Sequence, residues 1–193
     1  GEEGPRSVFP TLLGRPKSAF LGPVKNDLYF GQEAVEKDIA LDVSYPIVDS
    51  IEDNWDDMKK IWEYCFTNEL RCSSKEHKTM LTEAALNPKV NKEKMAEIMF
   101  ETFKVPGLFI AMQTALSLLS AGKFTGIVFE SGDGVTQFVP TVDDHPIPHS
   151  IDRIDLAGRK LTERMETRLN YLNIFFHTFF EKEIVVKDIK KKL

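Results

Sequence analysis

The sequence predicts an α/β fold, because strand-like and helical segments interleave along the whole chain. From Asn54 onward, apolar residues recur on one face of a helix, at Trp55, Met58, Ile61, Trp62, Cys65 and Phe66. Between residues 125 and 142, two apolar runs flank a turn that contains two glycines, which is typical of a hairpin. The chain has 193 residues, 42% of them hydrophobic, and this is enough to build a core.

The first half of the chain opens with strand and loop signals. Residues 5–16 are apolar and bounded by prolines, which predicts a strand between turns. Residues 17–27 form a loop, and residues 28–38 begin as a strand and turn helical. Asp53 or Asn54 can cap the helix that follows, so this helix has a defined start.

The second half continues the alternation. A further helix is marked by Met95, Ile98, Met99 and Phe103. The other expected elements, in chain order, are a short buried strand within 78–86 with a turn at Asn87-Pro88, a strand at 105–112, a helix at 113–123 that stops at Gly122, strands at 125–130 and 135–142, a strand within 147–156, and helices at 157–172 and 181–193.

Composition excludes several classes of function. The formal net charge is −5, which argues against nucleic acid as a partner because phosphate binding needs positively charged faces. No apolar run approaches the roughly 20 residues of a membrane span, so no membrane partner is expected. The two cysteines, Cys65 and Cys72, do not have a metal-ligand spacing and are expected to be reduced.

The turn ESGDGVTQ, residues 130–137, raises the question of a ligand. Glycines at two positions permit φ > 0 and close approach to the backbone, and successive N–H groups can form an anion-binding nest. A lone Gly-Asp-Gly is a weak signal, however. From the residues alone, a plain hairpin turn is the favoured interpretation and a phosphate-binding loop is the alternative.

Both ends of the chain are abrupt. No helix terminator follows Lys190-Lys191-Lys192-Leu193, and the start, GEEGP, is equally sudden. The sequence therefore predicts a piece of a larger protein.

Several long stretches together resemble actin, in the same order and with nearly the same spacing. They are PRSVFPTLLGRP, YPIVDSIEDNWDDMKKIW, LTEAALNPKVNKEKMAEIMFETF, AMQTALSLLSAGK, TGIVFESGDGVTQFVP and DRIDLAGRKLTERM. The resemblance implies the actin-like ATPase fold, a ribonuclease H-like two-lobed α/β architecture, of which this chain is the middle part. It assigns residues 1–120 to the first lobe, with a small subunit-contact subdomain at about 10–45, and residues 121–193 to the start of the second lobe with the second phosphate loop.

The resemblance also implies roles for the residues of the turn. Gly132, Asp133, Gly134 and Val135 correspond to the second phosphate loop. Glu130 stands where the family usually has Asp, which holds a divalent cation through water. Glu keeps the charge but adds a methylene, and a shift of about 1 Å can cost about 100-fold in rate.

Gln137 stands where the family usually has His. A Gln can orient an attacking water but cannot take its proton, so slower hydrolysis is expected. Tolerated drift at both Glu130 and Gln137 is the alternative.

The resemblance also implies roles for residues outside the turn. Gln113, at the start of a helix, corresponds to the glutamine that positions the attacking water. Gly158 lies near the nucleotide, with Asp155 and Arg159 supporting the cleft rather than binding ATP. Lys190 corresponds to a lysine near the adenine and ribose. Lys191 replaces a family Glu and offers no acceptor to the ribose hydroxyls.

The expected function is that of a cytoplasmic, cytoskeletal actin-like protein that binds ATP or ADP with Mg²⁺ (or Ca²⁺) in the cleft between lobes and assembles into filaments. Its partners would be other actin subunits and actin-binding proteins. The apolar residues Ala19, Phe20 and Leu21 correspond to a loop that docks into the next subunit. ATP hydrolysis is expected of a complete chain and not of these 193 residues alone.

The alternative function is a non-polymerising, actin-related structural subunit of a larger assembly, such as a ciliary motor or a chromatin complex. The departures at Glu130 and Gln137 fit this reading too, and the fold by itself does not decide between the two.

Overall fold

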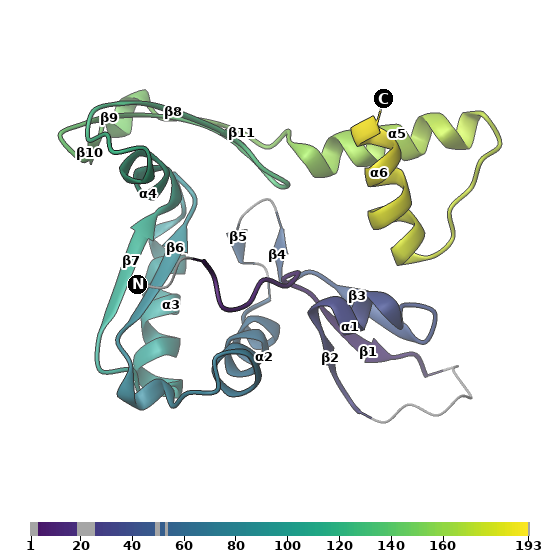
Figure 1. Ribbon diagram of the computed structural model, residues 1–193, viewed down its shortest axis with the longest axis horizontal. Helices are drawn as coiled ribbons and strands as arrows, with labels where there is room; N and C mark the ends of the chain where they lie inside the picture. Colours follow the sequence, from purple (N-terminus) through teal and green to yellow (C-terminus); the bar gives the residue numbers. More distant parts are fainter. Residues whose placement is uncertain (1–3, 19–25, 49–50, 53, 193) are drawn as a thin grey trace. The chain divides into compact units, whose positions relative to one another are not determined.

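The computed structural model describes residues 4–18, 26–48, 51–52 and 54–192 (Figure 1). The chain forms two compact units. Unit 1 comprises the described parts of Gly1–Ile47, Asp53–Arg71 and Lys160–Leu193, and unit 2 comprises the described parts of Val48–Glu52 and Cys72–Arg159. Both contain helices and strands, which confirms the α/β class. The division into lobes at residue 120 stays a prediction.

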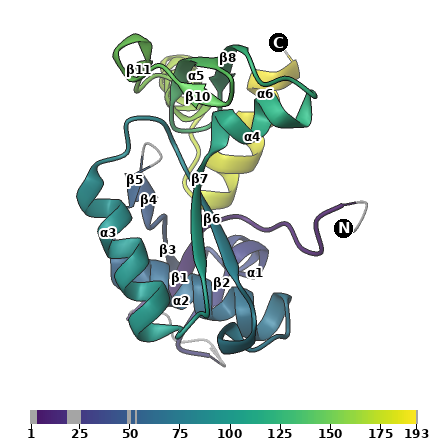
Figure 2. The same ribbon diagram turned by 90° about the vertical axis from the view of Figure 1, so that its left-hand side faces the viewer.

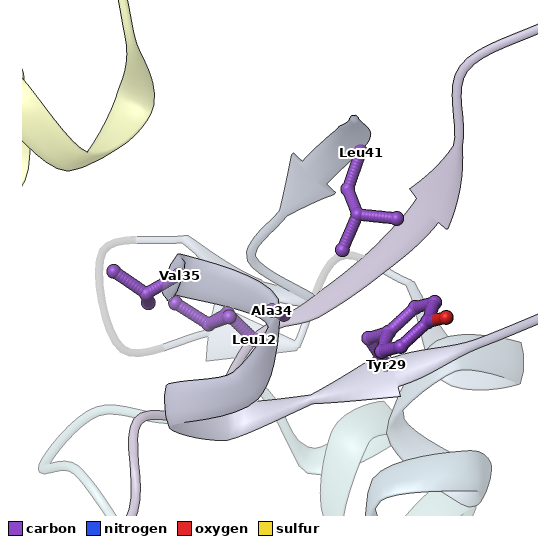
Figure 3. Packing of buried hydrophobic residues seen from close by; sticks show 5 residues of the cluster. All are labelled: Leu12, Tyr29, Ala34, Val35 and Leu41. Carbon is purple, nitrogen blue, oxygen red and sulfur yellow. The ribbon is translucent and has the colours of Figure 1, made fainter. Parts of the chain in front are cut away.

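Unit 1 contains a small antiparallel sheet in the order β2-β1-β3, with one short helix. The elements are β1 (Leu13–Pro16), β2 (Tyr29–Phe30), α1 (Gly31–Glu36) and β3 (Leu41–Ser44). A buried cluster joins the sheet to α1 and consists of Leu12, Tyr29, Ala34, Val35 and Leu41 (Figure 3).

Gly14 of β1 permits this close packing. A Cβ at Gly14 would lie 2.8 Å from Leu41 Cδ1, closer than real contacts allow. Leu41, Val43, Tyr45 and Phe179 extend the apolar contacts around the sheet.

The amphipathic pattern after Asn54 forms α2 (Trp55–Tyr64), which continues as a π-helical turn, Cys65–Glu69. The Asn54 side chain accepts a hydrogen bond from the Asp57 N–H at 3.1 Å, which confirms Asn54 as the cap. The predicted face is buried at Met58, Ile61, Trp62 and Phe66.

The last part of unit 1 contains α5 (Gly158–Tyr171), whose first two residues belong to unit 2, and α6 (Lys187–Lys192). A π-helical segment, Glu181–Val186, precedes α6. The helix continues directly from this segment into α6.

Unit 2 has a parallel strand pair, β6 (Thr79–Glu83) and β7 (Leu108–Met112). The connection between them contains α3 (Lys89–Glu97) and a π-helical turn, Ile98–Thr102. The helix lies alongside the two strands (Figure 2). The predicted helix residues Met95, Ile98, Met99 and Phe103 are all buried.

The rest of unit 2 is an antiparallel sheet with one helix beside it. Its elements are α4 (Gln113–Ser120), β8 (Gly126–Ser131), β9 (Thr136–Val142), β10 (His145–Pro146) and β11 (Asp152–Ile154). β9 pairs with β8 and also with β10 and β11, and α4 packs against β8. This arrangement confirms the predicted hairpin and positions the turn discussed below.

Shorter elements complete the description. They are the strands β4 (Ile47–Val48) and β5 (Ile51–Glu52), and 3-10 turns at Ser74–Glu76 and Pro148–Ser150. Within the described residues, no helix is long and apolar enough to cross a membrane. The proposed docking residues Ala19, Phe20 and Leu21 lie outside the described residues.

Candidate functional site

The turn between β8 and β9 is tightly closed. Ser131 and Thr136 are the last cross-strand partners of the hairpin, so residues 132–135 form the turn. The Gly132 N–H donates to the Val135 carbonyl at 3.1 Å. The Ser131 and Thr136 hydroxyls lie 2.8 Å apart, and Thr136 Oγ1 also donates to the Leu156 carbonyl at 2.7 Å.

The glycines of this turn permit positive φ but do not adopt it. Of the described glycines, only Gly31 and Gly122 have positive φ. A Cβ at Gly132 would meet only the Val135 carbonyl oxygen, at 4.0 Å. Gly132 therefore leaves space beside the turn. Neither Gly132 nor Gly134 adopts the left-handed conformation that favours glycine.

The start of α5 fixes the turn from the other side. The Gly158 N–H donates to the Gly132 carbonyl at 2.9 Å, and the Arg159 N–H donates to the Asp133 carbonyl at 2.8 Å. The Arg159 guanidinium also contacts Asp133 Oδ2, with Nε at 3.1 Å and Nη2 at 3.0 Å. Gly158 and Arg159 thus support the turn.

Two successive amides of the turn remain available. Within the described part of the chain, the N–H groups of Gly134 and Val135 form no hydrogen bond. Adjacent amides with no partner in a fixed turn are the arrangement that binds anions such as phosphate. The carbonyls of Gly132 and Asp133 accept bonds from the start of α5, so the turn keeps its shape without a ligand.

A cavity of about 280 Å³ lies beside this turn. It is lined by Gln113, Glu130, Ser131, Gly132, Val135 and Gln137. The structure therefore brings together five residues that the sequence proposed as site residues, from α4, β8, the turn and β9. Ser131 is an additional lining residue.

Gln137 and Glu130 are directly opposite each other in the hairpin. Gln137 Nε2 donates to Glu130 Oε2 at 2.9 Å, and Gln137 Oε1 accepts from the Ala85 N–H at 2.9 Å. The second oxygen of Glu130, Oε1, accepts a hydrogen bond from Ser117 Oγ of α4. Gln137 is only 2% exposed, so its amide is held at both ends in a buried position.

Gln113 stands at the first position of α4, after the end of β7. Its Nε2 approaches Thr82 Oγ1 of β6 at 3.4 Å. The Gln113 carbonyl oxygen can therefore accept a hydrogen bond from a water molecule in the cavity.

Lys190 is not part of this group, because it belongs to unit 1. Its Nζ donates to Thr162 Oγ1 of α5 at 2.8 Å. The neighbouring Lys191 instead lines a separate cavity of about 420 Å³ with residues 180–188 of the same helical segment. The two lysines therefore face different surroundings.

Glu130 is the carboxylate among the residues that line the cavity beside the turn. No three His, Cys, Asp or Glu side chains among the described residues gather to hold a metal. Mg²⁺ commonly keeps several waters and is bound by one or two carboxylates together with substrate phosphates. A single carboxylate, Glu130, next to two available amides suits that mode of binding.

Sequence reasoning missed Ser117 and the Ala85 N–H. The signal for Ser117 was available, because it lies four residues after Gln113 and hence on the same face of α4. The Ala85 amide carries no signal in the sequence, because the contact joins residues 52 positions apart.

Comparison with known families agrees with these observations. A sequence model of the family described as Actin matches residues 1–192, which is nearly the whole chain. The chain belongs to the actin family.

Proposed function

We propose that this protein binds the phosphates of ATP or ADP, with Mg²⁺ or Ca²⁺, at the turn of residues 132–135. The observation that carries the proposal is the cavity beside the turn, which is lined by Glu130, Gly132 and Val135. The Gly134 and Val135 amides of the same turn have no partner among the described residues. Backbone N–H groups carry the positive ends of the amide dipoles, and these attract anions such as phosphate.

Glu130 would hold the cation through water. Its two oxygens have about four lone-pair sites, and the two hydrogen bonds from Ser117 and Gln137 use one on each oxygen. The remaining sites can accept hydrogen bonds from water ligands of the cation. When bound, the cation supplies charge neutralisation to the phosphates.

Gln113 and Gln137 have different parts in the proposed hydrolysis. Gln113 can orient a water through its carbonyl oxygen, because only its Nε2 is engaged. Gln137 cannot accept a proton, and both ends of its amide are already bonded. Its role is then to hold Glu130, and we expect the complete protein to hydrolyse ATP more slowly than typical family members do. Ordinary turnover in a phosphate-release assay would contradict this expectation.

Membership of the actin family supports the remaining parts of the proposal. The nucleotide would lie between two lobes, the first formed by residues 1–120 and the second beginning at 121–193, with Lys190 near the adenine and ribose. The protein would assemble into cytoskeletal filaments in the cytoplasm. Pelleting at high protein concentration tests assembly, and a persistent monomer would favour a structural subunit of a fixed complex.

Substitution of Gly132 tests the nucleotide site. Gly132→Leu adds a side chain beside the cavity at a position where a Cβ has space, so the fold should tolerate it while phosphate binding is lost. Gly132→Ala is the matched control for backbone effects and should weaken binding less. Binding of a fluorescent ATP analogue to the complete protein measures the affinity of each variant. Thermal melting shows whether each variant is folded. Unchanged affinity in a folded Gly132→Leu protein would contradict the proposal.

A further inference from the structure

The Glu130 carboxylate is held by donors from two different elements. Ser117 Oγ of α4 donates to Oε1, and Gln137 Nε2 of β9 donates to Oε2. Hydrogen bonds to a charged acceptor are among the stronger ones in proteins. Both oxygens of Glu130 are therefore held by side chains of the protein itself.

The local fold explains why these three side chains meet. Side chains directly opposite each other in a hairpin lie on the same face of the sheet, and Glu130 and Gln137 are such a pair. α4 packs against β8, and Gly126 of that strand allows close contact, because a Cβ there would lie 3.3 Å from Leu118 Cδ1. Ser117 precedes Leu118 on this helix and reaches Glu130.

Gln137 is itself immobilised. Its Oε1 accepts from the Ala85 N–H, so the amide cannot rotate to offer its oxygen to Glu130 without losing that bond in a buried place. The Ala85 N–H thus selects the amide orientation in which Gln137 Nε2 donates to Glu130.

We propose that Ser117 is a positioning residue which, together with Gln137, sets the Glu130 carboxylate and thereby the strength of cation binding. The inference rests on the proposed nucleotide function. A glutamate side chain has more rotatable bonds than an aspartate and loses more entropy when it is ordered. Two donors from α4 and β9 order it in advance, so Glu130 and its hydrogen-bonding partners work as a matched set and are not independent departures from the family pattern.

The first experiment compares nucleotide affinity in Mg²⁺ and in EDTA for the complete protein and two variants. Ser117→Ala removes the donor to Oε1. Ser120→Ala is the matched control, because among the described residues its hydroxyl bonds only the Ser117 carbonyl on the same helix, at 2.7 Å. We expect Ser117→Ala to reduce the gain in affinity from Mg²⁺ roughly tenfold, as loss of one hydrogen bond to a charged group predicts.

Affinity in EDTA should be unchanged in Ser117→Ala, and Ser120→Ala should match the wild type in both conditions. A merely structural role of Ser117 would lower affinity equally with and without Mg²⁺, and that result would overturn the proposal. An unchanged gain from Mg²⁺ in Ser117→Ala would overturn it as well.

The second experiment separates this inference from the proposed function. Thermal melting without nucleotide is measured for Ser117→Ala, Glu130→Ala and the double variant. If Ser117 bonds Glu130, the double variant should melt at a temperature above that predicted by adding the two single shifts. Additive shifts would overturn the contact even if nucleotide binds. Non-additive shifts in a protein that retains no nucleotide would support the contact and refute the cation role.

Discussion

Arg159 and Asp133 are joined through both backbone and side chain. The Arg159 N–H donates to the Asp133 carbonyl at 2.8 Å, while Nε and Nη2 lie 3.1 and 3.0 Å from Oδ2 of the same residue. The start of α5 thereby holds the middle of the proposed phosphate loop.

Arg159→Lys should weaken nucleotide binding without preventing folding. The backbone bond remains, but a lysine ammonium cannot reproduce the planar guanidinium contact with the Asp133 carboxylate. Because the pair is partly exposed, we expect a modest loss, about threefold to tenfold in affinity. Equilibrium binding of ATP measures it. Arg164→Lys, at an exposed position of the same helix, is the control and should have no effect.

Asp57→Asn should destabilise unit 1 and remove part of its acid sensitivity. Arg15 donates to Asp57 Oδ2 at 3.0 Å, and the Asp57 side chain is only 3% exposed. The hydrogen bond from Arg15 lowers the pKa of Asp57 below its ordinary value. The Asp57 carboxylate therefore contributes fully to the free energy of unfolding above its unfolded pKa of about 4. This contribution is lost as the pH falls through the lower pKa of the folded state.

At neutral pH, we expect Asp57→Asn to cost about 1–3 kcal/mol, the range for a hydrogen bond to a charged group. Urea unfolding followed by tryptophan fluorescence measures this, because both tryptophans lie in α2 of unit 1. The cost should shrink toward pH 3, well below the unfolded pKa of about 4. Asp56→Asn, at an exposed position next to it, should change little. Equal effects at both positions would contradict the account.

Tyr64 should lose its phenolic proton at a higher pH than an ordinary tyrosine does. Its ring stacks on Phe30 with centroids 4.7 Å apart, and the hydrogen bond to Glu69 raises the pKa of Tyr64 to about 12. The contribution of Tyr64 to the free energy of unfolding should persist below about pH 10. It should decline as the pH rises toward the pKa of Tyr64 in the folded state. Tyrosinate absorbance should show a late-titrating group, which we assign to Tyr64. Glu69→Gln should move it earlier and Glu63→Gln should not, and no shift in Glu69→Gln would refute the assignment.

Gln137→Leu should destabilise unit 2 by about 1–3 kcal/mol, because the Ala85 N–H loses its partner in a buried place. Amide hydrogen exchange reports this locally, since the Ala85 amide should exchange faster in the variant. Gln32→Leu, on the exposed face of α1, is the control. Retained protection at Ala85 would show that Gln137 is not its partner.

Much of the secondary structure followed from the sequence because the signals were local. The helix face from Trp55 to Phe66 and the hairpin around Gly132 needed only apolar spacing and turn residues. The π-helical segment at Glu181–Val186 was not predicted, because apolar spacing does not distinguish a π-helical turn from an α-helical one.

The site was predicted only in part, because some of its contacts are not local in the sequence. Gln113, Glu130 and Gln137 were found through resemblance, and the structure places all three around one cavity. The hydrogen bonds from Ser117 to Glu130 and from Ala85 to Gln137 depend on packing between elements, which spacing does not reveal. The glycines of the turn permit positive φ, but the structure does not use it, and Gly132 instead leaves space.

The most direct test of the central claim is hydrogen exchange at residues 131–137 of the complete protein, with and without Mg-ATP. The Gly134 and Val135 amides have no partner within the described chain and should exchange fast in the free protein. The account predicts strong protection of these two amides when Mg-ATP is added. Unchanged exchange at Gly134 and Val135 under saturating nucleotide would contradict the claim that this turn binds phosphate.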